Sequence, residues 1–439
     1  MSRSYNKLFS CVFSTIILMA LVVPSHAMTI YWPKQDQIVR ENVKISIPGS
    51  SVPKDTFISI LVGEKGKENF VLAVNSENVR SKNGTINIFW DSKSPYRTVS
   101  NPKEDHNFKD GKYNIKIDIH RQGGNSSDII DTGSVPVVLK NMIARPNPAP
   151  GVRLVNRLSF GQLNTYKITS AVQVFEVVSG IALPIVGELG MSGEFKVAQS
   201  VEDVRSTGEY LLRYRIDGSP VVTQFGQKTK LYENDPIKPQ LYRVMDKYGH
   251  VTDRNMFSKQ SQFIITDILP VLPKHAVKEG DSWPDKMSLK LDGITDVIDL
   301  KGNCSMDSFE WQSGRECVKL VSKMSGKSTI SLADGKIRSS DDNVNADVVT
   351  YYDYKNEKMI RRDVILEFRV TVEPGTGDVS GQPAATPQSS SSRSRYYSAS
   401  PIAGDNYSQP GMSPSSGSTQ NAGFKKGKVQ ITASIVPAS

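Results

Sequence analysis

The segment Ile360-Arg-Arg-Asp-Val-Ile-Leu-Glu-Phe-Arg-Val-Thr-Val372 decides the fold class of the larger part of this chain. Its residues alternate between apolar and polar, a repeat of two that places one face of a strand against a core and the other against water. Arg362 is the one charge on the apolar face, and we expect it to reach water because it lies near the start of the strand. The predicted inward face carries Ile360, Arg362, Val364, Leu366, Phe368, Val370 and Val372.

The same alternation continues on both sides of this segment. It occurs at 210–217, and it returns at 427–436 after a long tract rich in Ser, Pro, Gly, Gln and Asn. Such a tract cannot bury enough apolar surface to offset the entropy of ordering it. We therefore predict a β-rich domain at 153–373, a disordered insertion at 374–426, and the last strand of the same domain at 427–439.

The region 28–140 reads as a second β domain. Val43–Ile47 and Tyr113–Ile119 alternate strictly, and Gly- and Asn-containing turns separate about seven short strands, a pattern typical of a β-sandwich. Residues 141–152 hold three prolines within Pro146–Pro150, so they are predicted to form an interdomain linker. The predicted fold class is mainly β: a sandwich plus a larger antiparallel half-barrel or sandwich, with one or two helices. The clearest helix candidate is about 253–269, ended by Pro270.

Two resemblances refine this interpretation. Ile30-Tyr-Trp-Pro33, Ile88-Phe-Trp-Asp91 and Phe108-Lys-Asp-Gly-Lys-Tyr113 resemble the bacterial Ig-like domains of exported proteins, in particular the Ig-like module of flagellar hook-capping proteins. Val277-Lys-Glu-Gly-Asp-Ser-Trp283 resembles a V-x-x-G-D-S-W segment of uncharacterised exported bacterial β-rich domains. The resemblances imply an Ig-like β-sandwich at 28–140, and they bring no activity with them.

The first 27 residues have the three parts of a secretory signal peptide. Arg3 and Lys7 precede the apolar run Leu8–Val23, and Ser25-His-Ala27 provides small residues at −3 and −1. We predict cleavage after Ala27 and an exported protein, periplasmic or secreted. Cleavage would remove two cations and no acid, so the formal charge would fall from +9 to +7. A retained anchor is the alternative, but the run is shorter than the roughly 20 residues of a spanning helix.

Export would leave two cysteines, Cys304 and Cys317, in an oxidising compartment, where a pair is most simply a disulfide. The register raises a difficulty. A hairpin turn at Gln312-Ser-Gly-Arg315 would place Cys317 opposite Glu310, so the predicted disulfide requires a bulge or another turn. Two cysteines without further ligands cannot fill a tetrahedral metal shell, so we expect no metal and no other cofactor.

No catalytic motif stands out. The sequence has no G-x-S-x-G or H-E-x-x-H pattern and no Gly-rich phosphate loop, so we expect no enzyme and no nucleotide or nucleic-acid partner. The predicted function is non-catalytic binding or scaffolding at the cell envelope, with an envelope protein or polymer as partner. A hydrolase with a dispersed site is one alternative. A carrier of a lipid or other hydrophobic ligand is another, with a predicted lining of Val174, Phe175, Val178, Ile181, Leu183 and Ile185.

Overall fold

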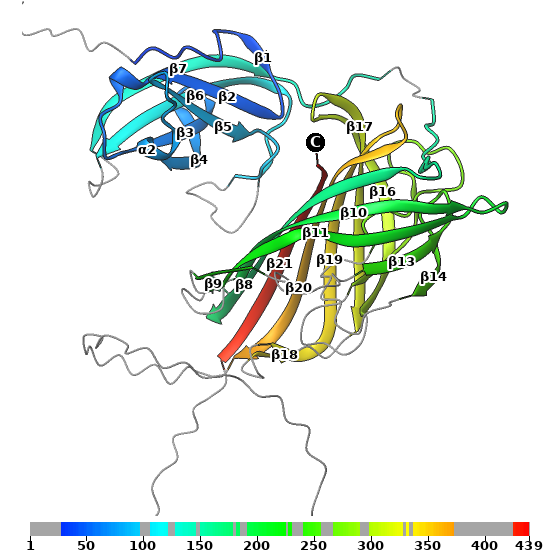
Figure 1. Ribbon diagram of the computed structural model, residues 1–439. Coiled ribbons are helices and arrows are strands. Elements are labelled where there is room, and N and C mark those ends of the chain that lie inside the picture. The colour runs from blue at the N-terminus through cyan, green and yellow to red at the C-terminus, as the bar shows by residue number, and fades with distance from the viewer. Residues whose placement is uncertain are drawn as a thin grey trace, which may run out of the picture.

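The computed structural model describes residues 28–96, 106–121, 128–145, 150–178, 181–184, 191–224, 227–230, 240–255, 267–289, 298–327, 331–332, 337–372 and 425–438 (Figure 1). The predicted signal peptide and residues 374–424 of the predicted insertion lie outside these ranges. Within them the chain is mainly β, which confirms the predicted fold class.

The N-terminal part contains a five-stranded sheet, in the order β1-β7-β6-β3-β4, and the two-stranded sheet β2-β5. A 3-10 turn, η1 (Gly49–Ser51), and a one-turn helix, α2 (Ser76–Val79), connect strands. The strands are β1 (Gln37–Val39), β2 (Asn42–Pro48), β3 (Thr56–Glu64), β4 (Lys67–Asn75), β5 (Thr85–Asp91), β6 (Gly111–Arg121) and β7 (Ile129–Leu139).

β-Branched side chains from both sheets form the core of this domain. Ile45 and Ile88 come from the two-stranded sheet, and Ile60 and Ile117 from the five-stranded sheet; each is at most 2% exposed. These residues stand on alternate positions of their strands, so one face of each sheet is buried against the other. No cysteine pair is needed, because packing of the two sheets holds the domain together.

The C-terminal part is one sheet of 14 strands that curves strongly (Figure 1). Its main path runs β14-β13-β11-β10-β8-β21-β20-β19-β17-β16-β15, so β21 lies in the middle of the sheet, between β20 and β8. β14 and β15 end the path and are not paired with each other. The strands are β8 (Leu163–Val178), β9 (Ile181–Pro184), β10 (Met191–Val204), β11 (Tyr210–Gln224), β12 (Gln227–Lys230), β13 (Gln240–Met245), β14 (Val251–Asn255), β15 (Ser282–Leu289), β16 (Ile298–Gln312), β17 (Arg315–Lys327), β18 (Ser331–Leu332), β19 (Ile337–Asp353), β20 (Lys358–Val372) and β21 (Lys425–Pro437).

The segment 267–281 fills the inside of this curved sheet. Leu272 and Val277 are fully buried in its core, and Trp283 follows them with its indole N–H donated to the Val271 carbonyl at 3.0 Å. The segment has no helix. The helix predicted at 253–269 is therefore wrong at both ends, because 253–255 belong to β14 and 267–269 are irregular. Residues 256–266 of that prediction lie outside the described ranges.

The predicted disulfide is also wrong, because Cys304 and Cys317 are both free and buried. Ser313 and Gly314 form a two-residue turn with φ of 52° and 69°, and this turn sets the register that places Cys317 opposite Glu310. Cys304 packs into the main core, whereas Cys317 packs with Tyr351 on the other face of the sheet. Burial raises the pKa of each thiol to about 12.

Arg362 does not reach water as predicted, because its side chain is only 1% exposed. Its guanidinium donates to the Ile268 carbonyl at 3.4 Å and to the Met287 sulfur at 3.8 Å. Ile360 also departs from the prediction, because it does not lie on the same face of the strand as Val364. A bulge opposite Tyr351 shifts the register there, so Ile360 packs with Cys317 and not with the core that contains Val364.

The two domains are joined by a buried junction. Lys93 of the N-terminal domain pairs with Glu310 of β16 at 2.9 Å, with both side chains about 10% exposed. Its ammonium also lies 4.2 Å from the ring centroid of Tyr351. The start of the predicted linker adds to β16, where Met142 bridges Glu310. The domains are therefore connected by ionic, aromatic and backbone contacts as well as by the chain itself.

Candidate functional site

A groove lies beside the end of β21, at the end of the curved sheet nearer the N-terminal domain; Figure 1 shows that end of the sheet. Its volume is about 790 Å³, which falls within the range of small-molecule sites. We call it the end groove. It is lined by Asn156, Arg157, Leu158, Gln162, Leu163, Asn164, Thr165, Tyr166, Leu269, Ser313, Arg315, Asn356, Glu357, Lys358, Met359, Ile360, Val436, Pro437 and Ala438.

The end groove has an apolar floor and an apolar mouth. Leu269 and Met359 are buried core residues that reach its floor. Leu163 at its side keeps 60% of its surface exposed, and Phe160, three residues earlier, keeps 74%. Large apolar side chains that remain exposed around a concave surface are typical of ligand and partner sites.

Asn156 is the least satisfied polar residue of the end groove. It is 3% exposed, and the nitrogen of its side-chain amide has no hydrogen-bond partner. Its backbone is fully engaged: its N–H donates to the Lys247 carbonyl at 2.8 Å, and its carbonyl accepts from the Tyr210 hydroxyl at 3.1 Å. Leaving a buried amide donor without a partner costs about 1–3 kcal/mol. A ligand with an acceptor atom would satisfy this amide.

A chain of buried polar side chains continues inward from the groove. Asn164 donates to Gln199 at 2.9 Å, and Gln199 donates to the Tyr214 hydroxyl at 2.7 Å. Tyr166 adds a weaker contact to the same Gln199 oxygen at 3.4 Å. Burial raises the pKa of both tyrosines, so their hydroxyls remain neutral donors and acceptors.

Three cations stand around the end groove. Arg157 pairs with Glu357 at 2.6 Å, and Arg315 pairs with the nearly buried Asp353 at 3.2 Å. Lys358 is exposed and forms no ion pair with another described residue. Glu357 is the one acid among the described lining residues, so the rim carries a net positive charge that favours an anionic group.

The open side of the curved sheet is held by Asp267. One carboxylate oxygen accepts from the Arg243 side chain on β13 at 3.4 Å, and the other accepts from the Ser288 backbone N–H on β15 at 2.8 Å. The Asp267 side chain is only 9% exposed, and that of Arg243 only 4%. Asp267 therefore acts as a clasp between β15, one end of the sheet path, and β13, the strand next to its other end.

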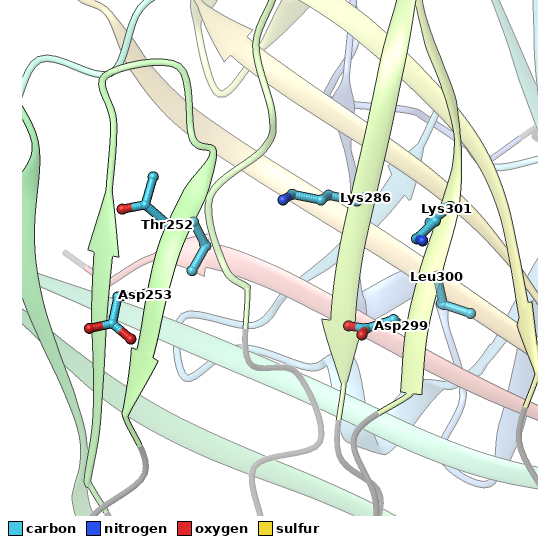
Figure 2. Close-up of a pocket in the computed structure, with 7 residues that line it drawn as sticks. Thr252, Asp253, Lys286, Asp299, Leu300 and Lys301 are labelled. Atoms are coloured by element: carbon cyan, nitrogen blue, oxygen red, sulfur yellow. The ribbon is translucent and has the colours of Figure 1, made fainter.

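A second cleft, of about 400 Å³, lies outside this clasp. In Figure 2, Thr252 and Asp253 line one side of it, and Lys286, with Asp299, Leu300 and Lys301, lines the other. Lys286 and Lys301 are directly opposite in the β15–β16 register. The two lysines and two aspartates cancel in charge, and no described residue that lines this cleft has a buried polar atom without a partner. The end groove is therefore the stronger candidate.

Asp285 is a buried carboxyl near Arg362 that neither hollow uses. It accepts from the Ser322 hydroxyl at 2.6 Å and from the Lys286 N–H at 2.8 Å. Burial is the largest influence on it and raises its pKa above the ordinary value of 3.8, although Arg362 acts in the opposite direction. The folded state therefore favours the protonated form of Asp285.

This raised pKa predicts a pH dependence of stability. A raised folded-state pKa gives stability that is present below pH 3.8 and is lost as the pH rises through the folded value. We expect the unfolding free energy of the wild type to fall, relative to that of Asp285→Asn, as the pH rises from 4 to 7. Urea unfolding across this range would measure it, with the exposed Asp253→Asn as control. A wild-type unfolding free energy that stays constant or rises relative to that of Asp285→Asn between pH 4 and pH 7 would contradict the prediction.

The ligand lining predicted from the sequence is only partly described. Val174, Phe175 and Val178 lie on β8, and Ile181 and Leu183 on β9, which pairs with the end of β8. Phe175 is half-buried, whereas the other side chains and the whole of Ile185 lie outside what the structure describes. Phe175, the one of the six whose side chain is described, does not line the end groove.

The residues of the end groove were missed by the sequence analysis. They come from separate segments around 156–166, 313–315, 356–360 and 436–438, which only the folded sheet brings together. Among the described residues, no cluster of His, Cys, Asp and Glu could hold a metal ion, and no helix is long and apolar enough to cross a membrane. No family model matches the chain, and no curated protein matches it.

Proposed function

We propose that this chain is an exported, non-catalytic binding protein that holds an amphipathic anion in the end groove. The ligand would have an apolar body and a carboxylate, phosphate or sulfonate head. The observation that carries this proposal is the buried Asn156 amide without a partner, set in a groove of about 790 Å³ that combines an apolar floor with a cationic rim.

The groove suggests how each part of the ligand is recognised. The apolar body would cover Leu163, Leu269 and Met359, and each buried CH₂ would contribute about 0.8 kcal/mol. The head group would lie toward Arg315 and Lys358, whose charges attract it. Asn156 would donate to an oxygen of the ligand and so recover its missing hydrogen bond.

Binding fits this groove better than hydrolysis does. The described lining contains no histidine or cysteine, and its one carboxylate, Glu357, is paired with Arg157. General acid–base catalysis needs a positioned titratable group that can reach the substrate. The predicted signal peptide would place such a binding protein in the cell envelope, where amphipathic anions are abundant components of membranes.

A fluorescence titration with 8-anilinonaphthalene-1-sulfonate tests the proposal, because this probe joins apolar rings to a sulfonate. We expect saturable binding that decanoate displaces at least tenfold more effectively than decanol, since only decanoate carries the head-group charge. We expect Leu163→Asp to weaken probe binding at least tenfold, about 1.4 kcal/mol. Ile38→Asp is the matched control, because Ile38 is an equally exposed apolar residue, 56%, on β1.

Lys358→Gln separates the head-group contribution from the apolar one. This variant should weaken decanoate binding and leave decanol binding unchanged. Equal affinity for decanoate and decanol in the wild type, or equal losses from Leu163→Asp and Ile38→Asp, would overturn the proposal. Circular dichroism of each variant would show that the fold is retained.

A further inference from the structure

The margins of the described sheets are protected to very different degrees. On β15, Pro284 has no N–H, the Lys286 N–H donates to the Asp285 carboxylate at 2.8 Å, and the Ser288 N–H donates to Asp267 at 2.8 Å. Proline and blocking side chains of this kind prevent another strand from pairing with an edge. The outermost strands β1 and β14 are short, with three and five residues.

β4 lacks the proline and the blocked N–H groups of β15, and it is longer than β1 and β14. It is a nine-residue strand at the end of the five-stranded sheet, and among the described residues it pairs only with β3. It contains no proline, and its centre is the apolar run Phe70-Val-Leu-Ala-Val74. Phe70 is 54% exposed. Its charges, Lys67 and Glu68, lie at one end and leave the apolar run open.

The sequence of β4 is complementary to itself. A bulge at Val71 leaves Phe70 and Ala73, three residues apart, both exposed on the outer side. If two copies pair antiparallel about an axis between Val71 and Leu72, Phe70 of each copy faces Ala73 of the other. A large side chain then lies against a small one on the outer face, and Val71 faces Leu72 on the inner face. Glu68 would face Asn75, so no like charges meet.

We propose that two copies of this chain associate through antiparallel pairing of β4, which joins their five-stranded sheets into one. The contact would be two-fold symmetric, as most homodimer contacts are. The junction with the large domain uses Lys93 and Met142, not β4, so the end groove and the domain junction stay as they are. This inference is independent of the function proposed for the end groove.

Sedimentation velocity of the full mature chain tests the pairing. We expect a dimer at tens of micromolar, because a strand-to-strand contact lies at the small, weak end of interface sizes. Ala73→Lys should weaken association at least tenfold, since it places a charge against the partner's Phe70. Phe89→Lys is the matched control, because Phe89 is an exposed aromatic residue, 61%, on β5.

A cross-linking variant provides a second measurement. Phe70→Cys combined with Ala73→Cys should form covalent dimers on oxidation with diamide, because facing residues of paired strands lie about 5 Å apart. The two cysteines of one chain would be roughly 10 Å apart along the strand and could not bond to each other. The native Cys304 and Cys317 are buried and should not compete. A monomer at all concentrations, or a dimer that Ala73→Lys leaves intact, would overturn the proposal.

Discussion

Replacing Asp267 by alanine should lower the unfolding free energy by about 3–5 kcal/mol, the loss typical of breaking a buried charged pair. The carboxylate holds Arg243 on β13 and the Ser288 N–H on β15, so one substitution removes a link between the two sides of the curved sheet. Asp267 also belongs to the packed segment that carries Leu272 and Val277 into the core. Urea unfolding followed by tryptophan fluorescence would measure the change.

Two further substitutions make this result specific. Asp267→Asn keeps an oxygen that can accept from the Ser288 N–H but removes the charge that attracts Arg243, so we expect an intermediate loss. Asp253→Ala removes an exposed carboxylate on the neighbouring β14 and should change the unfolding free energy by less than about 0.5 kcal/mol. Equal effects of Asp267→Ala and Asp253→Ala would show that Asp267 is not a clasp.

Lys93→Met should separate the unfolding of the two domains. Lys93 and Glu310 are both about 90% buried at the junction, and Lys93 also donates to the Trp311 carbonyl. Removing the cation leaves Glu310 with the longer ion pair to Lys319, 3.5 Å, and the hydrogen bond from the Ser308 hydroxyl, 3.0 Å, so we expect a loss of about 3 kcal/mol. Differential scanning calorimetry should then show two transitions in place of one.

The exposed ion pair Lys355–Glu316 is the matched control for this prediction. Its atoms are closer, at 2.6 Å, but its lysine is 57% exposed. Lys355→Met should therefore change the unfolding free energy much less than Lys93→Met does and leave a single transition. A wild type that already unfolds in two transitions would contradict the account of the junction.

The alternation of apolar and polar residues along the strands was sufficient to predict the fold class. The strand at 360–372 was recognised because one face is almost wholly apolar, and the turn at Ser313-Gly314 set the register of the hairpin that contains Cys317. That register was already at odds with a disulfide. Only the structure shows that Cys304 and Cys317 also lie on opposite faces of the sheet.

What could not be predicted depends on contacts between distant segments. Arg362 was expected near water, but segment 267–281 packs over it. The sequence of 360–372 alone cannot predict this contact, because it depends on a distant segment. The apolar spacing within 253–269 predicted a helix, whereas Ile268 packs into the core from an irregular segment; an apolar core segment has a similar composition whether or not it is helical. Nothing in the sequence around Asn156 marks it as a binding residue, since an amide without a partner can be recognised only in the folded structure.

The central claim is that the end groove binds an amphipathic anion, and a crystal structure of the protein with decanoate tests it most directly. The account predicts decanoate in the end groove, with its chain along Leu163 and Leu269, its carboxylate toward Arg315 and Lys358, and the Asn156 amide donating to one of its oxygens. An end groove that stays empty while decanoate occupies the cleft beside Lys286, or no site at all, would contradict it.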